Sequence, residues 1–171
     1  MKRRGWLMGA AGAAAAVTGA GGYLWREQAG AAERFDPLWS MRFPQPDGGE
    51  LVMAERRGKP LLLNFWDTWC PPCLKEMPDL DRFARAFGGR GWQVVGLAID
   101  GPTPVREFLQ RTPVGFAIGL AGFDGTDLSR QLGNAQGALP FTAVFDAKGR
   151  IVQRKLGQTT FAELETWGKS V

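Results

Sequence analysis

The sequence contains no histidine, and this absence removes several kinds of active site. Without histidine there is no Cys-His or Ser-His pair to act as nucleophile and general base. The c-type haem motif Cys-x-x-Cys-His is also excluded, because Leu74 follows the second cysteine. Zinc needs a full tetrahedral set of ligands, and two thiolates do not supply one. We therefore expect neither a bound metal nor another cofactor.

Cysteine is scarce as well: Cys70 and Cys73 are the only two in 171 residues. Scaffolds held together by disulfides carry several pairs at wider spacing, so this class is excluded. The 44% of apolar residues can fill the core of one ordinary domain without such bonds. A disulfide between Cys70 and Cys73 closes so short a loop that it adds little stability. The pair is therefore expected to serve chemistry.

Basic and acidic residues nearly balance outside the N-terminal segment, so little net positive charge remains there. The net charge is +4, and most of it lies within residues 1–31. Residues 32–171 contain no Lys/Arg cluster that would make many phosphate contacts, so we expect no nucleic-acid partner.

The N-terminus has the pattern of an export leader. Lys2-Arg3-Arg4 precedes the uncharged segment Gly5–Leu24, which is rich in Ala and Gly and long enough to cross a bilayer as a helix. The basic flank is expected to stay in the cytoplasm. Arg3-Arg4 also resembles a twin-arginine signal, so export through either the general or the twin-arginine route stays open.

Cleavage of this leader is a second open question. Ala29-Gly30-Ala31 fits a small-residue cleavage site, but the pattern slightly favours a retained anchor. We therefore expect a signal peptide or membrane anchor in residues 1–31 and a folded domain in 32–171. The domain would lie in a bacterial periplasm or on the extracytoplasmic side of the inner membrane.

The chain after the leader predicts an α/β fold with a central mixed sheet flanked by helices. The apolar run 60–66 predicts a buried strand, the spacing in 71–89 a helix, and 92–99 a second, parallel strand. Residues 26–50 are expected to form a linker that passes into a short first strand. Further strands are expected at 50–53, 116–120, 141–146 and 150–155, further helices at 104–111 and 159–167, and a single helical turn at 127–132.

The cysteines fall at the end of the buried strand and the start of the helix. Unpaired N–H groups there stabilise a thiolate and lower its pKa from about 8.5 to roughly 3.5–7.5. Cys70 is therefore the expected nucleophile and Cys73, one turn further on, the resolving thiol. Pro71 and Pro72 suit the first helical turn and stiffen the loop between the sulfurs. Such a pair exchanges electrons with a disulfide without a cofactor.

The segment Phe65–Cys73 resembles the active site of the thioredoxin fold. Asn64, the Pro-Pro pair and Glu76-Met77-Pro78 make it similar to the TlpA/ResA branch of exported thiol:disulfide oxidoreductases. Gly137–Ile151 resembles the stretch of that family around its cis-proline and the hairpin that follows. The resemblance covers about residues 35–171.

This resemblance implies a thioredoxin fold and a reductase of protein disulfides, with cytochrome c maturation as one setting. The partners would be proteins with thiols or disulfides and a membrane-bound or exported electron donor; an uncleaved leader would add membrane contact. Pro140 would be cis and face the cysteines, whereas its position before a strand alone favours a trans proline. The implied substrate-binding residues are Trp69, Pro71, Pro72, Leu139 and Pro140.

Three residues near the cysteines have competing interpretations. The resemblance gives Glu76 a catalytic role in proton transfer or in tuning the thiols, and the alternative is a solvated helix charge. Asn64 occupies the position at which cytoplasmic thioredoxins keep a buried carboxylate, and Glu76 would partly substitute for it. Asp67 departs from the small residue that is usual in the family; it would oppose thiolate formation or alter docking if close to Cys70, or lie in solvent.

Three other functions of this fold are alternatives to an oxidoreductase. A copper metallochaperone usually adds a histidine or uses a wider cysteine spacing. A redox-inactive binding module would not need the intact cysteine pair. A peroxide reductase would need a Thr-x-x-Cys pattern, which this sequence does not contain. The sequence therefore favours thiol:disulfide exchange.

Overall fold

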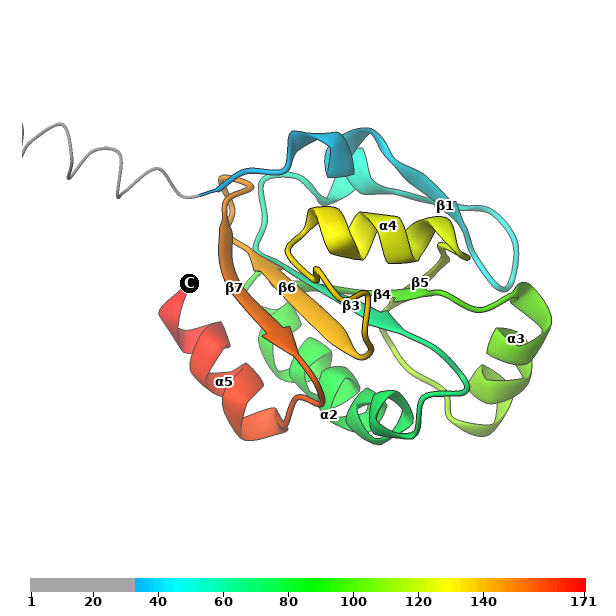
Figure 1. Cartoon of the computed structure of the whole chain (residues 1–171). Coiled ribbons are helices and arrows are strands. Elements are labelled where there is room, and N and C mark those ends of the chain that lie inside the picture. The colour runs from blue at the N-terminus through cyan, green and yellow to red at the C-terminus, as the bar shows by residue number, and fades with distance from the viewer. Residues whose placement is uncertain (1–32) are drawn as a thin grey trace, which may run out of the picture. The chain divides into compact units, whose positions relative to one another are not determined.

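Residues 33–171 are described by the structure, a computed structural model (Figure 1). The expected leader segment Gly5–Leu24, its cleavage site and the boundary after residue 31 lie outside this range. Within the range, no helix has both the length and the apolar character needed to cross a membrane.

A five-stranded mixed sheet forms the centre of the domain, in the order β5-β4-β3-β6-β7. Strands β3 (Leu61–Trp66) and β4 (Gln93–Ala98) are parallel, as the sequence predicts. All six residues of β3 are buried, because helices and loops cover both faces of the sheet. The remaining strands of this sheet are β5 (Ala117–Leu120), β6 (Phe141–Phe145) and β7 (Ile151–Leu156).

Helices cover the two faces of the sheet and create two hydrophobic cores (Figure 1). Helix α2 (Pro71–Gly88) packs with α5 (Phe161–Ser170) on one face, and α3 (Pro102–Arg111) adds its apolar side chains to the same core. Helix α4 (Asp124–Gln131) lies on the opposite face. This arrangement confirms the expected α/β fold with a mixed central sheet.

The segment before the sheet is more ordered than the sequence analysis predicted. Instead of a linker up to residue 50, it contains a 3₁₀ helix, η1 (Asp36–Ser40), and a hairpin of β1 (Arg42–Pro44) and β2 (Glu50–Val52). A second 3₁₀ helix, η2, covers Met53–Arg56. The cause is burial: apolar side chains of η1 and β1 enter the core beneath α4. Elements of so few residues give almost no periodic signal.

Several expected boundaries also shift. Helix α3 begins at Pro102, since proline fits the first helical turn, and α4 is a full helix where only a turn was expected. The hairpin between β6 and β7 forms as predicted, with Gly149 at positive φ in the turn. The Leu139-Pro140 peptide is cis. The trans proline favoured by the local sequence is therefore wrong, and the cis proline implied by the family resemblance is confirmed.

Candidate active site

The two cysteines lie at the start of α2, after the turn that follows β3. Cys70 caps the helix N-terminus, and its Sγ accepts a hydrogen bond from the Cys73 N–H at 3.3 Å. The two residues form a disulfide with their Cα atoms 5.2 Å apart. Cys73 is fully buried and Cys70 is partly exposed. A partner can therefore reach only the Cys70 sulfur, which is also the one that the helix N-terminus stabilises as a thiolate.

The turn before Cys70 is fixed by two carboxylates. Asp67 Oδ1 accepts a hydrogen bond from the Trp69 N–H at 2.8 Å, so this carboxylate holds the turn itself. The Thr68 hydroxyl donates to Asp100, whose other oxygen accepts from the Gly101 N–H at 2.8 Å. Asp100 thus ties the turn to the end of β4. Asp100 follows β4 much as Asp67 follows β3, but no motif in the sequence marks it as part of the site.

Glu76 lies on the buried face of α2, one helical turn after Cys73, and is inaccessible to solvent. Its Oε1 accepts a hydrogen bond from Asn64 Nδ2 at 2.7 Å. Its Oε2 accepts two more, from the backbone N–H and the hydroxyl of Thr159, both at 2.7 Å. The interpretation of Glu76 as a solvated helix charge is therefore wrong.

Burial dominates the ionisation of this carboxyl group. It raises the pKa of Glu76 above its ordinary value, against the hydrogen bonds from Thr159 and Asn64 and the positive charge of Lys155, which lower it. Lys155 itself forms an ion pair with Glu163 of α5. Glu76 can therefore hold a proton at a pH at which surface glutamates are ionised. It also contacts Asn64 directly, so a carboxyl group lies beside the position that holds one in cytoplasmic thioredoxins.

The cis-proline loop reaches the same end of the sheet as the cysteines. Phe141, the first residue of β6, pairs with Phe65 near the end of β3, which places Leu139 and Pro140 beside the turn that leads to Cys70. Pro140 is buried, Leu139 is half-buried, and the Pro140 carbonyl accepts a hydrogen bond from the Gly157 N–H at 2.8 Å. Leu139 and Cys70 pack against the same hydrophobic core.

Exposed apolar side chains lie at this end of the sheet. Trp69 is 83% exposed, and Phe123, beyond the end of β5, is 90% exposed. Leu156, at the end of β7, is also exposed and pairs with Phe141 of β6. Phe123 and Leu156 were missed in the sequence analysis. The signal for Phe123 was a large aromatic residue between Gly122 and Asp124, in a short loop after a strand.

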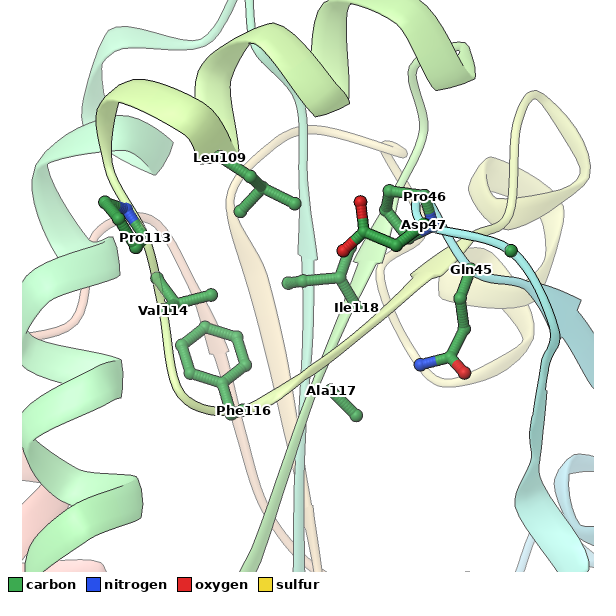
Figure 2. Close-up of a pocket in the computed structure, with 10 residues that line it drawn as sticks. Gln45, Pro46, Asp47, Leu109, Pro113, Val114, Phe116, Ala117 and Ile118 are labelled. Atoms are coloured by element: carbon green, nitrogen blue, oxygen red, sulfur yellow. The ribbon is translucent and has the colours of Figure 1, made fainter.

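A cavity of about 330 Å³ lies elsewhere, between the β1–β2 hairpin loop and the segment that leads from α3 into β5 (Figure 2). Side chains of Pro46, Phe116 and Ile118 are among its lining. It lies beside the start of β5, whereas the cysteines lie at the opposite end of the parallel strand β3. None of the expected site residues lines this cavity, so it takes no part in the cysteine chemistry.

Within residues 33–171, no group of three or more His, Cys, Asp or Glu side chains is placed to hold a metal ion. A copper site built on Cys70 and Cys73 would have the two sulfurs and no third side-chain ligand of these types.

Known proteins with similar sequences and structures agree with this chemistry. The model of the Redoxin family matches residues 15–167. The thiol-disulfide oxidoreductase ResA of Geobacillus kaustophilus is 31% identical over 127 residues, which cover 72% of this chain and 70% of that protein. ResA of Bacillus cereus is 29% identical over 120 residues, which cover 70% and 67%.

Two solved structures illustrate the similarity of the fold. A thioredoxin-related protein from Neisseria meningitidis serogroup B has a TM-score of 0.67 and 29% identity, with 76% of this chain and 97% of that chain covered. A secreted Mycobacterium tuberculosis disulfide oxidoreductase homologous to Escherichia coli DsbE has a TM-score of 0.66 and 23% identity, with 80% and 100% covered. The chain thus belongs to the Redoxin family, has the thioredoxin fold and is a thiol:disulfide oxidoreductase.

Proposed function

We propose that this protein reduces disulfides of protein substrates outside the cytoplasm, with Cys70 as nucleophile and Cys73 as resolving thiol. The observation that carries the proposal is the difference in access between the two sulfurs: Cys70 is partly exposed at the helix N-terminus, and Cys73 is buried behind it.

The reaction proceeds in two exchanges. The Cys70 thiolate attacks one sulfur of the substrate disulfide, forms a mixed disulfide and releases the other substrate sulfur as a thiolate. Cys73 then loses its proton and attacks the Cys70 sulfur. This second step releases the remaining substrate sulfur and forms the Cys70–Cys73 disulfide, so two electrons pass to the substrate.

Glu76 is proposed to accept the proton that Cys73 loses. The carboxyl group lies one turn below Cys73 on the same buried face of α2. Water has poor access to a buried thiol, so an internal base makes its deprotonation easier. The raised pKa of Glu76 suits this role, because the group can hold the proton and later return it.

The substrate is proposed to bind across the apolar residues around Cys70. Trp69, Pro71 and Pro72 come from the turn and the helix start, and the backbone of Leu139 before Pro140 would pair with the substrate chain. To these residues of the sequence analysis we add Phe123 and Leu156, because large apolar side chains left exposed beside a reactive group are suited to bind a partner.

Replacing Trp69 by alanine is expected to raise KM for a protein disulfide such as insulin about tenfold, which is about 1.4 kcal/mol of binding free energy. The rate with a small disulfide, which needs no docking surface, should stay near that of the wild type. Val152→Ala is the matched control, because Val152 is 41% exposed on β7 away from the cysteines. An equal loss with both substrates would contradict a docking role.

The setting of the reaction follows from the N-terminal segment. We propose that residues 1–31 form a signal peptide or anchor and that residues 32–171 form the domain it exports to the periplasm or the outer side of the inner membrane. A membrane-bound or exported donor would then re-reduce the cysteine pair, and cytochrome c maturation is one pathway that needs such a reductant. The M. tuberculosis disulfide oxidoreductase of similar fold is secreted, which agrees with this placement.

The direction of exchange is tested by the reduction potential of the Cys70–Cys73 couple. For a reductant we expect a value near −270 mV, measured by equilibrating the full-length protein with a dithiothreitol redox buffer. A value near −120 mV would instead identify an oxidant and overturn the proposed direction.

A further inference from the structure

Four polar side chains meet in the core beneath the cysteines, and all four are fully buried. They come from four separate segments: Asn64 of β3, Glu76 of α2, Thr142 of β6, and Thr159 from the turn between β7 and α5. The Glu76 carboxyl group is the centre of this cluster, because it accepts three hydrogen bonds. Thr159 donates two of the three, one from its backbone and one from its side chain.

The two oxygens of Glu76 have different neighbours. Oε1 faces only the Asn64 amide nitrogen, which is a donor, whereas Oε2 faces the Thr159 N–H and also the Thr159 hydroxyl, which can donate or accept. A proton on Oε1 would therefore point at another donor. A proton on Oε2 can be donated in a hydrogen bond to the Thr159 hydroxyl oxygen, provided that the hydroxyl rotates its own hydrogen away from Oε2.

The amide of Asn64 is held in this orientation by a second contact. Its Nδ2 also donates to the Thr142 hydroxyl at 3.1 Å, while its buried Oδ1 has no partner among the described residues. Leaving a buried acceptor without a donor costs free energy, and the two hydrogen bonds donated by Nδ2 offset this cost. Asn64 is therefore a fixed donor, and Thr159 is the neighbour that can adapt to the protonation state of Glu76.

The charge that acts on Glu76 comes from β7. Lys155 on β7 is the charged group that acts on Glu76, and it is paired with Glu163 of α5. The groups facing Glu76 from β3 and β6, Asn64 and Thr142, are neutral. Glu163 also closes the capping box with Thr160 at the start of α5, directly after Thr159. The α5 N-terminus thus fixes both the position of Thr159 and the ion pair of Lys155.

We propose that Thr159 is the positioning residue of Glu76: its N–H and hydroxyl hold the carboxyl group, and its hydroxyl reverses direction when Glu76 gains or loses a proton. The inference deepens the proposed function, since the proton in question is the one that Cys73 releases. In that step the ionised Glu76 takes the proton from Cys73, and Glu76 then gives the same proton up, so that the departing substrate thiolate ends as a thiol and Glu76 is ionised again.

Carbon-13 NMR titration of the Glu76 carboxyl group in the oxidised protein tests this inference. The signal is assigned by its loss in Glu76→Gln. Thr159→Val keeps the shape and the N–H but removes the hydroxyl, and the midpoint of the Glu76 titration should rise by about one pH unit, because a hydrogen bond to a carboxylate is stronger than one to a neutral acid. Thr159→Ser should restore the midpoint of the wild type, and Thr166→Val, on the exposed side of α5, should leave it unchanged.

An unchanged midpoint in Thr159→Val would overturn the inference, and so would an equal rise in Thr159→Ser, which would assign the effect to the methyl group. If the valine variant does not fold, Thr159→Ala removes the hydroxyl without its bulk and is held to the same outcomes. Stopped-flow measurement of mixed-disulfide resolution against pH separates this inference from the proposed function. A shifted Glu76 midpoint with an unshifted rate profile supports the role of Thr159 and refutes proton transfer from Cys73 to Glu76.

Discussion

Replacing Cys73 by alanine is expected to turn the protein into a trap that holds its substrates on Cys70. The first exchange needs only the Cys70 thiolate, which the N-terminus of α2 still stabilises in the variant. The second exchange has no resolving thiol, so the mixed disulfide persists. Turnover in an insulin-reduction assay should fall by a factor on the order of 10³ or more. Mass spectrometry with a disulfide-containing peptide should show one stable adduct on Cys70.

Cys70→Ser is the matched control for this experiment, since it keeps one cysteine and removes the exposed one. It should lose turnover equally but form no adduct, because Cys73 is fully buried. Adducts on Cys73 in that variant, or turnover that persists in Cys73→Ala, would show that the assignment of the two sulfurs is wrong.

The region around Cys70 could be predicted from the sequence because its signals are local. The apolar run that forms β3, the two prolines at the start of α2 and the spacing along that helix lie within one continuous stretch of chain. Each follows from short-range rules of burial and capping. The same locality explains why the parallel pairing of β3 with β4 across a single helix was correctly expected.

The surroundings of Glu76 could not be predicted because they depend on distant segments. The spacing from Cys73 places Glu76 on a face of α2, but the packing of this face against β3 and the turn before α5 decides that it is buried. Its main partner, Thr159, lies 83 residues further along the chain. No periodicity within α2 carries that information, so a solvated charge and a buried acid looked alike in the sequence.

Asp67 shows how a residue that departs from its family can have a local explanation. Its carboxylate accepts the Trp69 N–H within the turn, as aspartate commonly does two residues before its partner. The gain is a better-defined turn before Cys70, held from the other side by the bond between Thr68 and Asp100.

Glu76→Gln is expected to lower the free energy of unfolding of the oxidised protein by about 2 kcal/mol at acidic pH. Glutamine keeps one acceptor for Asn64 but places an amide N–H₂ group against the Thr159 N–H, which then lacks its acceptor in the core. Urea unfolding of both proteins measures the difference. Glu107→Gln, on the exposed side of α3, is the control and should change stability little.

The difference in the free energy of unfolding between the wild type and Glu76→Gln should decrease as pH rises. Because the pKa of Glu76 is raised in the folded protein, its stabilising contribution is complete below the pKa of the unfolded chain and is lost as pH rises through the folded pKa. Glutamine does not titrate, so the advantage of the wild type over Glu76→Gln should shrink from acidic towards neutral pH. In the oxidised protein the cysteines do not titrate, which leaves Glu76 as the group that this comparison isolates. An advantage that instead grew with pH would mean that the hydrogen bonds from Thr159 and Asn64 outweigh burial and keep Glu76 ionised, and such a Glu76 would be a poor store for the proton of Cys73.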